Sequence, residues 1–361
     1  MNSYKFETIA IDKKARVNKV NINGKEFLTP IFMPVATRGS IKSLPLDYLQ
    51  NSKILLANTY HLYLRPGLDV IKRSNGLHEF INWKNLILTD SGGFQGWSIP
   101  NKLDNSGINF KNIYDGSSFK MTPKLSMEIQ NILNSDIAMI LDNLVNIDAS
   151  YENQKNAITT TFNWASEARN IHSNKNQSLF GIVQGGLNKE LRGISAEQMI
   201  SLDFDGYAIG GLAIGESSED RIDIVKHTVD YLPKNKLRYV MGLGDIKGMI
   251  DLIELGIDMF DCVWPARLAR HGKIINKSTF FNLKNAKYQN DINPLVLDCY
   301  CYTCKNYSKS YLRHLLINEN TSSWFYLTLH NIVQTENIIK EIQESILNSN
   351  FDKYKENLIN E

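Results

Sequence analysis

The chain has 361 residues, of which 43% are hydrophobic, and its 40 basic and 38 acidic side chains leave a formal net charge of only +2. This length allows one large domain, since single α/β barrels commonly exceed about 250 residues. A near-neutral charge argues against a protein that coats nucleic acid, so any RNA site must be a local patch. Without a membrane-length apolar stretch or a secretion signal, we expect a cytoplasmic protein with no membrane partner.

The N-terminal part predicts a β-hairpin, in which Arg16–Ile22 and Lys25–Thr29 flank Asn23-Gly24. That dipeptide readily adopts the positive φ angles of a two-residue turn. Short runs that are apolar throughout then recur along the chain, and such runs are typical of strands buried on both faces of a parallel sheet. They are Pro30–Val35, Ile54–Ala57, Leu86–Thr89, Ile137–Leu141, Leu179–Val183, Tyr207–Ile209, Tyr239–Met241 and Ile257–Phe260.

Stretches of helical length separate several of these runs, for example Ser150–His172 and Lys189–Leu202. This alternation indicates βα units, and about eight units predict a closed (β/α)8 barrel of the TIM type. An open doubly wound sheet is the alternative that periodicity leaves open. In a barrel, the carboxyl ends of all strands meet at the face that carries the active site. The residues that follow the runs are Asp90, Asp142, Gln184, Gly210-Gly211, Gly242 and Asp261.

Three of the four cysteines lie close together, at Cys299, Cys301 and Cys304. Three thiolates and one imidazole make a closed, structural Zn²⁺ site. His330 and His314 both follow the cluster, and spacing alone chooses between them only weakly. We expect the metal to clip residues 297–331, as an inserted C-terminal subdomain, onto a single catalytic barrel domain that spans residues 1–361.

Two carboxylates on one rim suit chemistry at an anomeric carbon, where one attacks C1′ and the other transfers a proton. Asp261 is a better candidate than Asp258, because alternation puts the two on opposite faces and Asp261 lies at the strand end. Asp142 can then accept hydrogen bonds from a guanine edge, and the Gln184 amide can both donate and accept. For these two side chains, a capping role at a strand end is the alternative.

The turn after Asp90 contains Ser91, Gly92, Gly93 and Phe94. Paired glycines let the backbone approach a flat ligand closely, although an ordinary helix-capping turn is the alternative. Arg267 and Arg270 follow Asp261 directly. They suit contacts to phosphates or unpaired bases, and a solvated loop paired with surface acids is the alternative.

Together these residues resemble the tRNA-guanine transglycosylase (queuine tRNA-ribosyltransferase) family, bacterial type. The resemblance covers nearly the whole chain, and its several motifs occur in one order before the cysteine cluster. The matching stretches are Ala57–Gly67, Thr89–Gln95, Gly181–Gly186, Gly210–Glu216, Met241–Gly244 and Phe260–Arg270.

The resemblance implies a homodimeric pentosyltransferase with one structural Zn²⁺, which replaces guanine at the wobble position of tRNAs with a GUN anticodon in queuosine biosynthesis. It implies Asp261 as the nucleophile of a covalent ribosyl intermediate and Asp90 as the general acid/base, and it selects His330 as the fourth zinc ligand. The residues that it implies for the base are Ser91, Gly92, Gly93, Phe94, Asp142, Gln184, Gly211 and Leu212. Those that it implies for RNA are Gly242, Gly244, Arg267 and Arg270.

The sequence constrains the identity of the incoming base less than it constrains the type of reaction. The bacterial form uses 7-aminomethyl-7-deazaguanine, but residues 143–147 depart from its usual Glu-Cys-Thr-Pro-Tyr. Ile214 is bulky where queuine-accepting relatives have a small residue, and it should exclude the cyclopentenediol. We therefore expect the aminomethyl base, with queuine salvage as the alternative. A non-catalytic RNA-binding subunit is a further alternative, but it should have lost Asp90 or Asp261. A glycoside hydrolase would leave the arginines unexplained.

Overall fold

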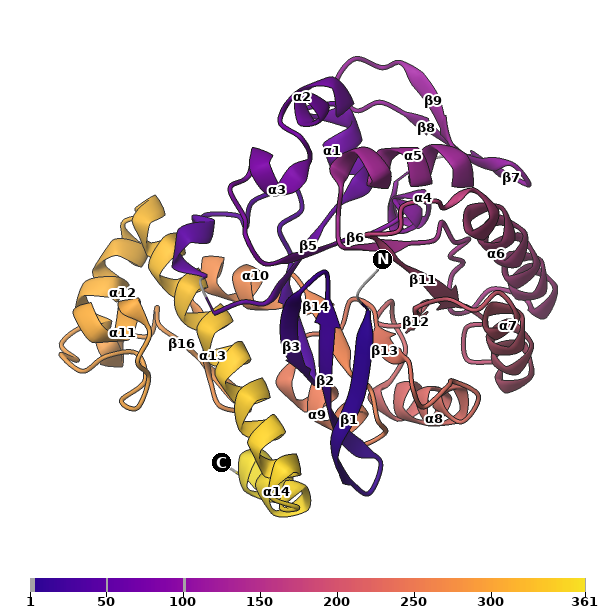
Figure 1. Cartoon of the computed structure of the whole chain (residues 1–361). Helices are drawn as coiled ribbons and strands as arrows, with labels where there is room; N and C mark the ends of the chain where they lie inside the picture. Colours follow the sequence, from indigo (N-terminus) through magenta and orange to yellow (C-terminus); the bar gives the residue numbers. More distant parts are fainter. Residues whose placement is uncertain (1–3, 50, 100–101, 361) are drawn as a thin grey trace.

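The structure, a computed structural model, describes residues 4–49, 51–99 and 102–360. Its centre is an eight-stranded parallel sheet with the order β4-β14-β13-β12-β11-β10-β6-β5 (Figure 1). A parallel bridge from Val35 to Leu56 joins the two outer strands and closes the barrel. The strands are β4 (Ile31–Pro34), β5 (Ile54–Ala57), β6 (Leu86–Thr89), β10 (Ile137–Met139), β11 (Ser178–Val183), β12 (Gly206–Ile209), β13 (Leu237–Val240) and β14 (Met259–Cys262).

Each predicted apolar run is one of these strands, with ends that differ by at most two residues. The predicted (β/α)8 barrel is therefore confirmed, and the open doubly wound sheet is excluded. The strands are buried on both faces because helices cover the outside of the barrel. The helical segments between barrel strands and after β14 are η1 (Leu46–Tyr48), α1 (Thr59–Leu64), α2 (Leu68–Arg73), α3 (Leu77–Phe80), α4 (Gly93–Ser98), α5 (Pro123–Leu133), α6 (Tyr151–Ile171), α7 (Lys189–Ser201), α8 (Ser218–Val229), α9 (Ile246–Ile253) and α10 (Trp264–Arg270).

An N-terminal antiparallel sheet covers the end of the barrel at which the strands begin. Its strands are β1 (Lys5–Asp12), β2 (Ala15–Ile22) and β3 (Lys25–Thr29). The predicted hairpin is confirmed, with Asn23 and Gly24 at φ angles of 52° and 80°. Sequence reasoning missed β1, whose residues are all exposed or half-buried and therefore lack a strong apolar signal.

A buried ion pair fastens this sheet to the barrel. Arg16 of β2 donates from Nε and Nη2 to the Asp258 carboxylate at 2.9 and 2.6 Å, and Asn18 donates to it at 2.7 Å. Asp258 is fully buried and directly precedes β14. It lies at the opposite end of the strand from the expected active-site face, so its role is structural, in contrast to that of Asp261.

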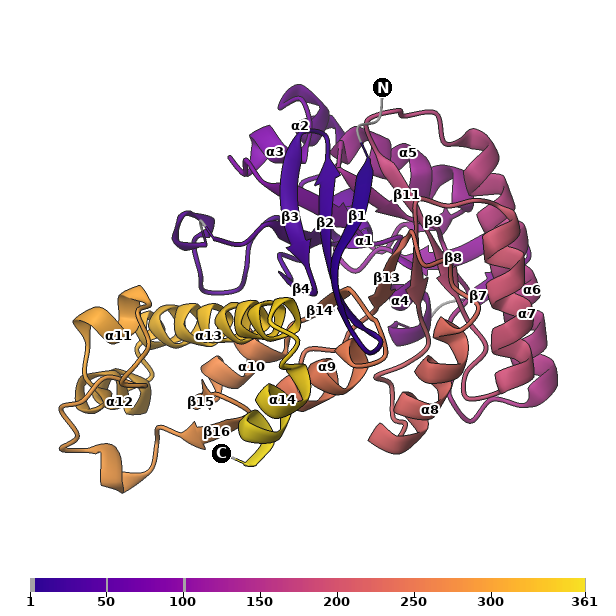
Figure 2. The same ribbon diagram turned by 60° about the horizontal axis from the view of Figure 1, so that its bottom comes forward.

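Two insertions complete the fold. The first, between α4 and α5, is an antiparallel sheet of β7 (Lys102–Asp104), β8 (Gly107–Lys111) and β9 (Ser118–Met121), which sequence reasoning did not predict. The second follows α10, and its long helix α13 packs against α10 and the N-terminal sheet (Figure 2). It contains β15 (Lys273–Asn276), β16 (Thr279–Asn282), η2 (Ala286–Tyr288), α11 (Tyr302–Asn306), α12 (Lys309–Ile317), α13 (Thr321–Leu347) and α14 (Phe351–Asn360). Among the described helices, none has the length and apolar character that a bilayer crossing needs.

Candidate active site and metal centre

The three predicted carboxylates gather at the face where the barrel strands end. Asp90 follows β6 directly, Asp142 lies three residues beyond β10, and Asp261 lies within β14. Burial raises the pKa of Asp90 to about 7, the N–H groups of Thr59 and Gly92 oppose this shift, and the charges of Asp261 and Asp142 add to it. Because the charges of Asp261 and Asp142 both act on Asp90, the three carboxylates lie near one another at this face.

The start of α1 holds the Asp90 carboxylate in place. Its Oδ1 accepts a hydrogen bond from the Thr59 backbone N–H at 2.8 Å, and its Oδ2 accepts one from the Asn58 side-chain amide. Asn58 also caps α1, since its Oδ1 accepts from the His61 N–H at 2.9 Å. The cap of the helix and the orientation of the candidate acid/base therefore depend on the same side chain.

Asp261 has one engaged and one available oxygen. Its Oδ1 accepts hydrogen bonds from the Gly242 N–H, at 2.8 Å, and from the Tyr239 hydroxyl. Burial raises the pKa of Asp261, and these two hydrogen bonds oppose the rise. Within the described residues Oδ2 has no hydrogen-bond donor, so it is the oxygen that is free to attack a substrate carbon.

Asp142 and Gln184 form the part of the site that suits a purine edge. The Gln184 amide donates to Asp142 Oδ2 at 2.6 Å, and burial raises the pKa of Asp142 to about 6. Two glycines make room for these side chains. A Cβ on Gly93 would lie 2.2 Å from Asp142 Oδ1, and one on Gly211 would lie 2.5 Å from Gln184 Oε1. Any larger residue at either position would displace the Asp142 or Gln184 side chain.

The buried guanidinium of Arg192, on α7, supports the same pocket. It donates at 2.8 Å to the carbonyls of Val183 and Gly186, which lie on either side of Gln184. Its Nη2 has no partner among the described residues and lies 3.6 Å from the position of a Cβ on Gly211. Burial lowers the pKa of Arg192 to about 9. This side chain thereby fastens the turn that carries Gln184 to α7.

Sequence reasoning assigned no role to Asn58, Tyr239 or Arg192. Arg192 lies four and seven residues before Ala196 and Met199, which places it on the buried face of α7. A charged residue on such a face could have indicated a functional or structural role. Tyr239 was a polar-tipped aromatic in an otherwise apolar run. Neither pattern identifies the hydrogen-bond partner of the side chain. The Tyr239 hydroxyl donates to Asp261 on the neighbouring strand, and Arg192 donates to carbonyls at the end of β11 and in the turn after it.

The predicted RNA-contacting residues line two cavities that share Cys262, the residue after Asp261, in their walls. The first, of about 180 Å³, is lined by Arg267 and Arg270 together with Lys42. The second, of about 290 Å³, is lined by Gly242 and Gly244. Among the described residues, the arginines that pair with carboxylates are Arg16 and Arg221. Arg267 and Arg270 therefore present uncompensated positive charge at the rim.

Three further residues predicted to contact the base differ in exposure. Phe94 is 50% exposed and lies against Trp97, with ring centres 5.5 Å apart. Leu212 is buried, and Ser91 is buried with its Oγ 3.5 Å from Asp142 Oδ1. Phe94, four residues after Asp90, thus has an exposed aromatic ring that is available for stacking.

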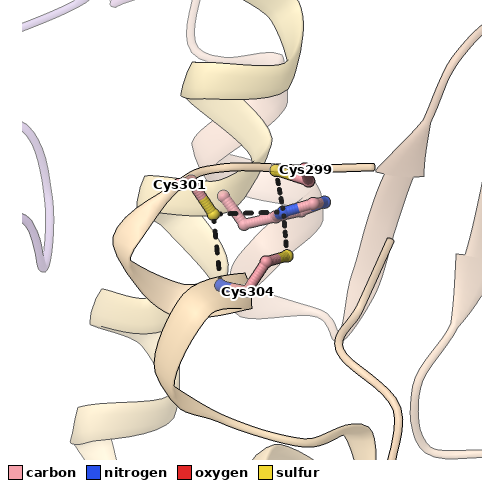
Figure 3. A group of neighbouring side chains, drawn as sticks. Cys299, Cys301 and Cys304 are labelled. Carbon is pink, nitrogen blue, oxygen red and sulfur yellow. Dashed lines mark hydrogen bonds between the residues drawn. The ribbon is translucent and has the colours of Figure 1, made fainter. Parts of the chain in front are cut away.

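The predicted metal ligands converge in the second insertion (Figure 3). The ligand atoms of Cys299, Cys301, Cys304 and His330 all lie within 4.8 Å of one another and are buried. The three sulfurs lie 3.3 to 3.6 Å from His330 Nδ1, and Nε2 faces the Ile275 carbonyl at 3.0 Å. Donation from Nε2–H to that carbonyl leaves Nδ1 as the metal-binding atom.

The donor set fits one structural Zn²⁺, because a Cys₃His site leaves no ligand position for water. The neighbouring thiols Cys299 and Cys304 lower the pKa of Cys301 to about 3 by hydrogen bonding, so a thiolate is favoured there. His314, the other candidate ligand, is exposed and hydrogen-bonds to Asn318 instead. The assignment of His330 is therefore confirmed.

Comparison with known proteins gives one consistent result. The sequence model of the queuine tRNA-ribosyltransferase family matches residues 12–361. A queuine tRNA-ribosyltransferase of Buchnera aphidicola subsp. Schizaphis graminum is 44% identical, with 99% of each chain covered. One from Dictyoglomus turgidum is 42% identical over 99% of this chain and 94% of the relative. One from Dehalococcoides mccartyi is 44% identical over 91% of this chain and 84% of the relative. With its barrel, its converging carboxylates and its Cys₃His site, the chain belongs to the queuine tRNA-ribosyltransferase family.

Proposed function

We propose that this chain exchanges guanine at the wobble position of GUN-anticodon tRNAs for 7-aminomethyl-7-deazaguanine. The observation that carries the proposal is the convergence of Asp90 and Asp261 beside a purine-reading pair, Asp142 and Gln184. The unpaired arginines Arg267 and Arg270 next to this site suit a polyanionic substrate, and family membership agrees with it. The zinc, when bound, supplies structural support and takes no part in the chemistry.

In the first half of the reaction, Asp261 Oδ2 attacks C1′ of the wobble ribose. A C–O bond forms, the glycosidic C–N bond breaks, and the departing guanine takes the electron pair of that bond together with a proton from Asp90. A pKa near 7 leaves Asp90 partly protonated at neutral pH, as a proton donor requires. In the second half, Asp90 removes the N–H proton of the incoming base, whose nitrogen attacks C1′ and releases the Asp261 carboxylate.

When a purine binds, hydrogen bonds to the purine take the place of the one between Gln184 and Asp142. Asp142 then accepts from the ring N–H and the exocyclic amine, while the Gln184 amide donates to the carbonyl. Ile214, half-buried after β12, supports the smaller aminomethyl base, because the cyclopentenediol of queuine needs more room. Queuine salvage is the competing proposal, and it is supported by the departure at residues 143–147.

The test is base exchange on a GUN-anticodon tRNA preloaded with radiolabelled guanine, chased separately with 7-aminomethyl-7-deazaguanine and with queuine. We expect the first base alone to release the label. Release by queuine as well would overturn the base assignment, and release by neither base would overturn the exchange activity itself. A matched DNA hairpin serves as the control, and we expect it to retain its label.

The same assay in a single turnover reports the protonation state of Asp90. Its pKa is raised to about 7, so the protonated form persists up to that pH and disappears above it. We expect the rate of guanine release to fall about tenfold per pH unit above 7, and to fall on the acid side as Asp261 becomes protonated. A release rate that keeps rising from pH 7 to pH 9 would contradict the assignment of Asp90 as the acid.

We further propose a cytoplasmic homodimer, with residues 297–331 as a zinc subdomain of one catalytic domain. Exposed apolar side chains around the zinc ligands support the dimer, since Leu297 is 73% and Tyr300 78% exposed. Three clustered thiols suit a reducing compartment. We expect Tyr300→Ser to shift sedimentation towards the monomer at a given concentration. A wild-type chain that sediments as a monomer at micromolar concentration would overturn the proposal.

A further inference from the structure

A second group of basic and phenolic side chains lies on chain segments other than the one that carries Arg267 and Arg270. Arg38 follows β4, and Arg65 follows α1. Tyr60 and His61 lie in α1, which packs against β8 and β9 through Tyr60 (Figure 1). Tyr114 lies in the turn between β8 and β9. We call these five residues, from three separate parts of the chain, the donor cluster.

Tyr114 is the point at which the donor cluster converges. The Arg65 guanidinium carbon lies 3.6 Å from the centre of the Tyr114 ring, and that of Arg38 lies 6.0 Å from it. The rings of Tyr60 and His61 are in edge contact at 5.3 Å. Burial, and then the Arg38 charge, lower the pKa of His61, so the cation acts on that ring as well.

The polar atoms of the donor cluster have unused hydrogen-bonding capacity. The hydroxyls of Tyr60 and Tyr114 and the Nδ1 of His61 are buried without a partner among the described residues, and Tyr60 is fully buried. Neither Arg38 nor Arg65 is among the described arginines that pair with a carboxylate. Buried polar groups are unfavourable unless they are hydrogen-bonded. A ligand with several acceptor oxygens and negative charge would match the exposed guanidinium groups of Arg38 and Arg65 beside Tyr114.

The nearest acid does not fill this role. Asp115 follows Tyr114, and the Arg65 charge contributes to lowering the Asp115 pKa. However, Asp115 Oδ1 already accepts hydrogen bonds from the N–H and the hydroxyl of Ser117, at 2.9 and 2.6 Å. The guanidinium N–H groups of Arg65 therefore stay available to an external anion.

The donor cluster borders the candidate active site. Asn58 and Thr59, which hydrogen-bond to Asp90, directly precede Tyr60 in the chain. Thr37, which directly precedes Arg38, lines the 180 Å³ cavity together with Arg267 and Arg270. Basic side chains thus extend from the Asp90 side of the pocket, across the ends of β5 and β4, to the Asp261 side.

We propose that Arg38, Arg65 and Tyr114 form an anion site for a phosphodiester of the tRNA backbone next to the exchanged nucleotide. This inference rests on the proposed function, because a polynucleotide substrate is what brings a phosphodiester to this face. A nucleotide drawn out of its stack needs its backbone held on both sides. Arg267 and Arg270 would hold the backbone on the Asp261 side, and the donor cluster would hold it on the Asp90 side.

The test is tRNA affinity of the double variant Arg38→Gln/Arg65→Gln, measured by filter binding across a salt series. We expect a several-fold weaker Kd at low salt, and a slope of log K against log [salt] that is flatter by roughly 0.7 for each phosphate that the variant no longer neutralises. The KM for tRNA should rise, while kcat and the KM for the free base stay unchanged, since neither arginine reaches the reacting atoms. Both arginines are exposed, so the fold should tolerate the change.

Arg169→Gln is the matched charge control, because Arg169 is also exposed but lies at the far end of α6, where it donates to the Leu202 carbonyl at 3.1 Å. We expect it to leave the slope unchanged. Tyr114→Phe keeps the ring and removes the hydroxyl, so it should weaken binding at an unchanged slope. Wild-type binding in the double variant, or an equal loss in Arg169→Gln, would overturn this site alone. A wild-type chain that binds no tRNA would overturn the proposed function instead.

Discussion

Replacement of Asp261 by asparagine is expected to abolish base exchange. In the proposed mechanism the variant loses the oxygen that forms the covalent bond to C1′, and removal of a catalytic nucleophile lowers turnover by at least about 10⁴-fold. The variant should also fail to form a covalent complex with tRNA, which in the wild type would survive denaturation. tRNA affinity should change little, because phosphate contacts hold the RNA and use different side chains.

Asp258→Asn is the matched control, with the same change three residues earlier and at the other end of the strand. Asp258 pairs with Arg16 at 2.6 Å and is fully buried. Its replacement leaves a buried guanidinium without its counter-charge, so the free energy of unfolding should fall by about 3 kcal/mol or more. The molecules that remain folded should still exchange guanine. Turnover by Asp261→Asn, or full stability of Asp258→Asn, would contradict the division of roles between these acids.

Loss of the metal is expected to have the second large effect. In His330→Ala the Cys₃His site loses its only imidazole, and the hydrogen bond to the Ile275 carbonyl goes with it. Because metal binding is coupled to local folding, residues 297–331 should exchange their amide hydrogens rapidly, and stability should fall by more than about 3 kcal/mol. Zinc content, hydrogen exchange and thermal melting measure these three effects.

The loss of the metal should also affect the side chains that we propose to bind RNA. His330 lies in α13, and α13 packs against α10, the helix that carries Arg267 and Arg270. We therefore expect weaker tRNA binding by the zinc-depleted chain. His314→Ala is the control, since His314 is exposed in the same insertion and makes its hydrogen bonds within α12 and to Asn318. A His330→Ala protein that still binds one zinc ion and melts like the wild type would contradict the assignment.

The sequence determined the barrel strands and the ligand atoms of the three thiols. Each depends on residues that are close in the chain. A run such as Ile54–Ala57 is apolar on both faces wherever it packs, and the spacing of Cys299, Cys301 and Cys304 brings the sulfurs together within one turn. The ends of the strands also indicated Asp90, Asp142 and Asp261, because parallel strands place their carboxyl ends on one face.

Only the tertiary structure decided which partner each of these groups has. The choice of His330 over His314 depends on how α13 crosses the insertion, and the free oxygen of Asp261 depends on Tyr239 of the neighbouring strand. The donor cluster likewise joins segments from different βα units. Hydrogen bonds and charge pairs act over a few ångströms in space, whatever the separation in the chain. Periodicity therefore cannot specify them, and packing of the closed barrel does.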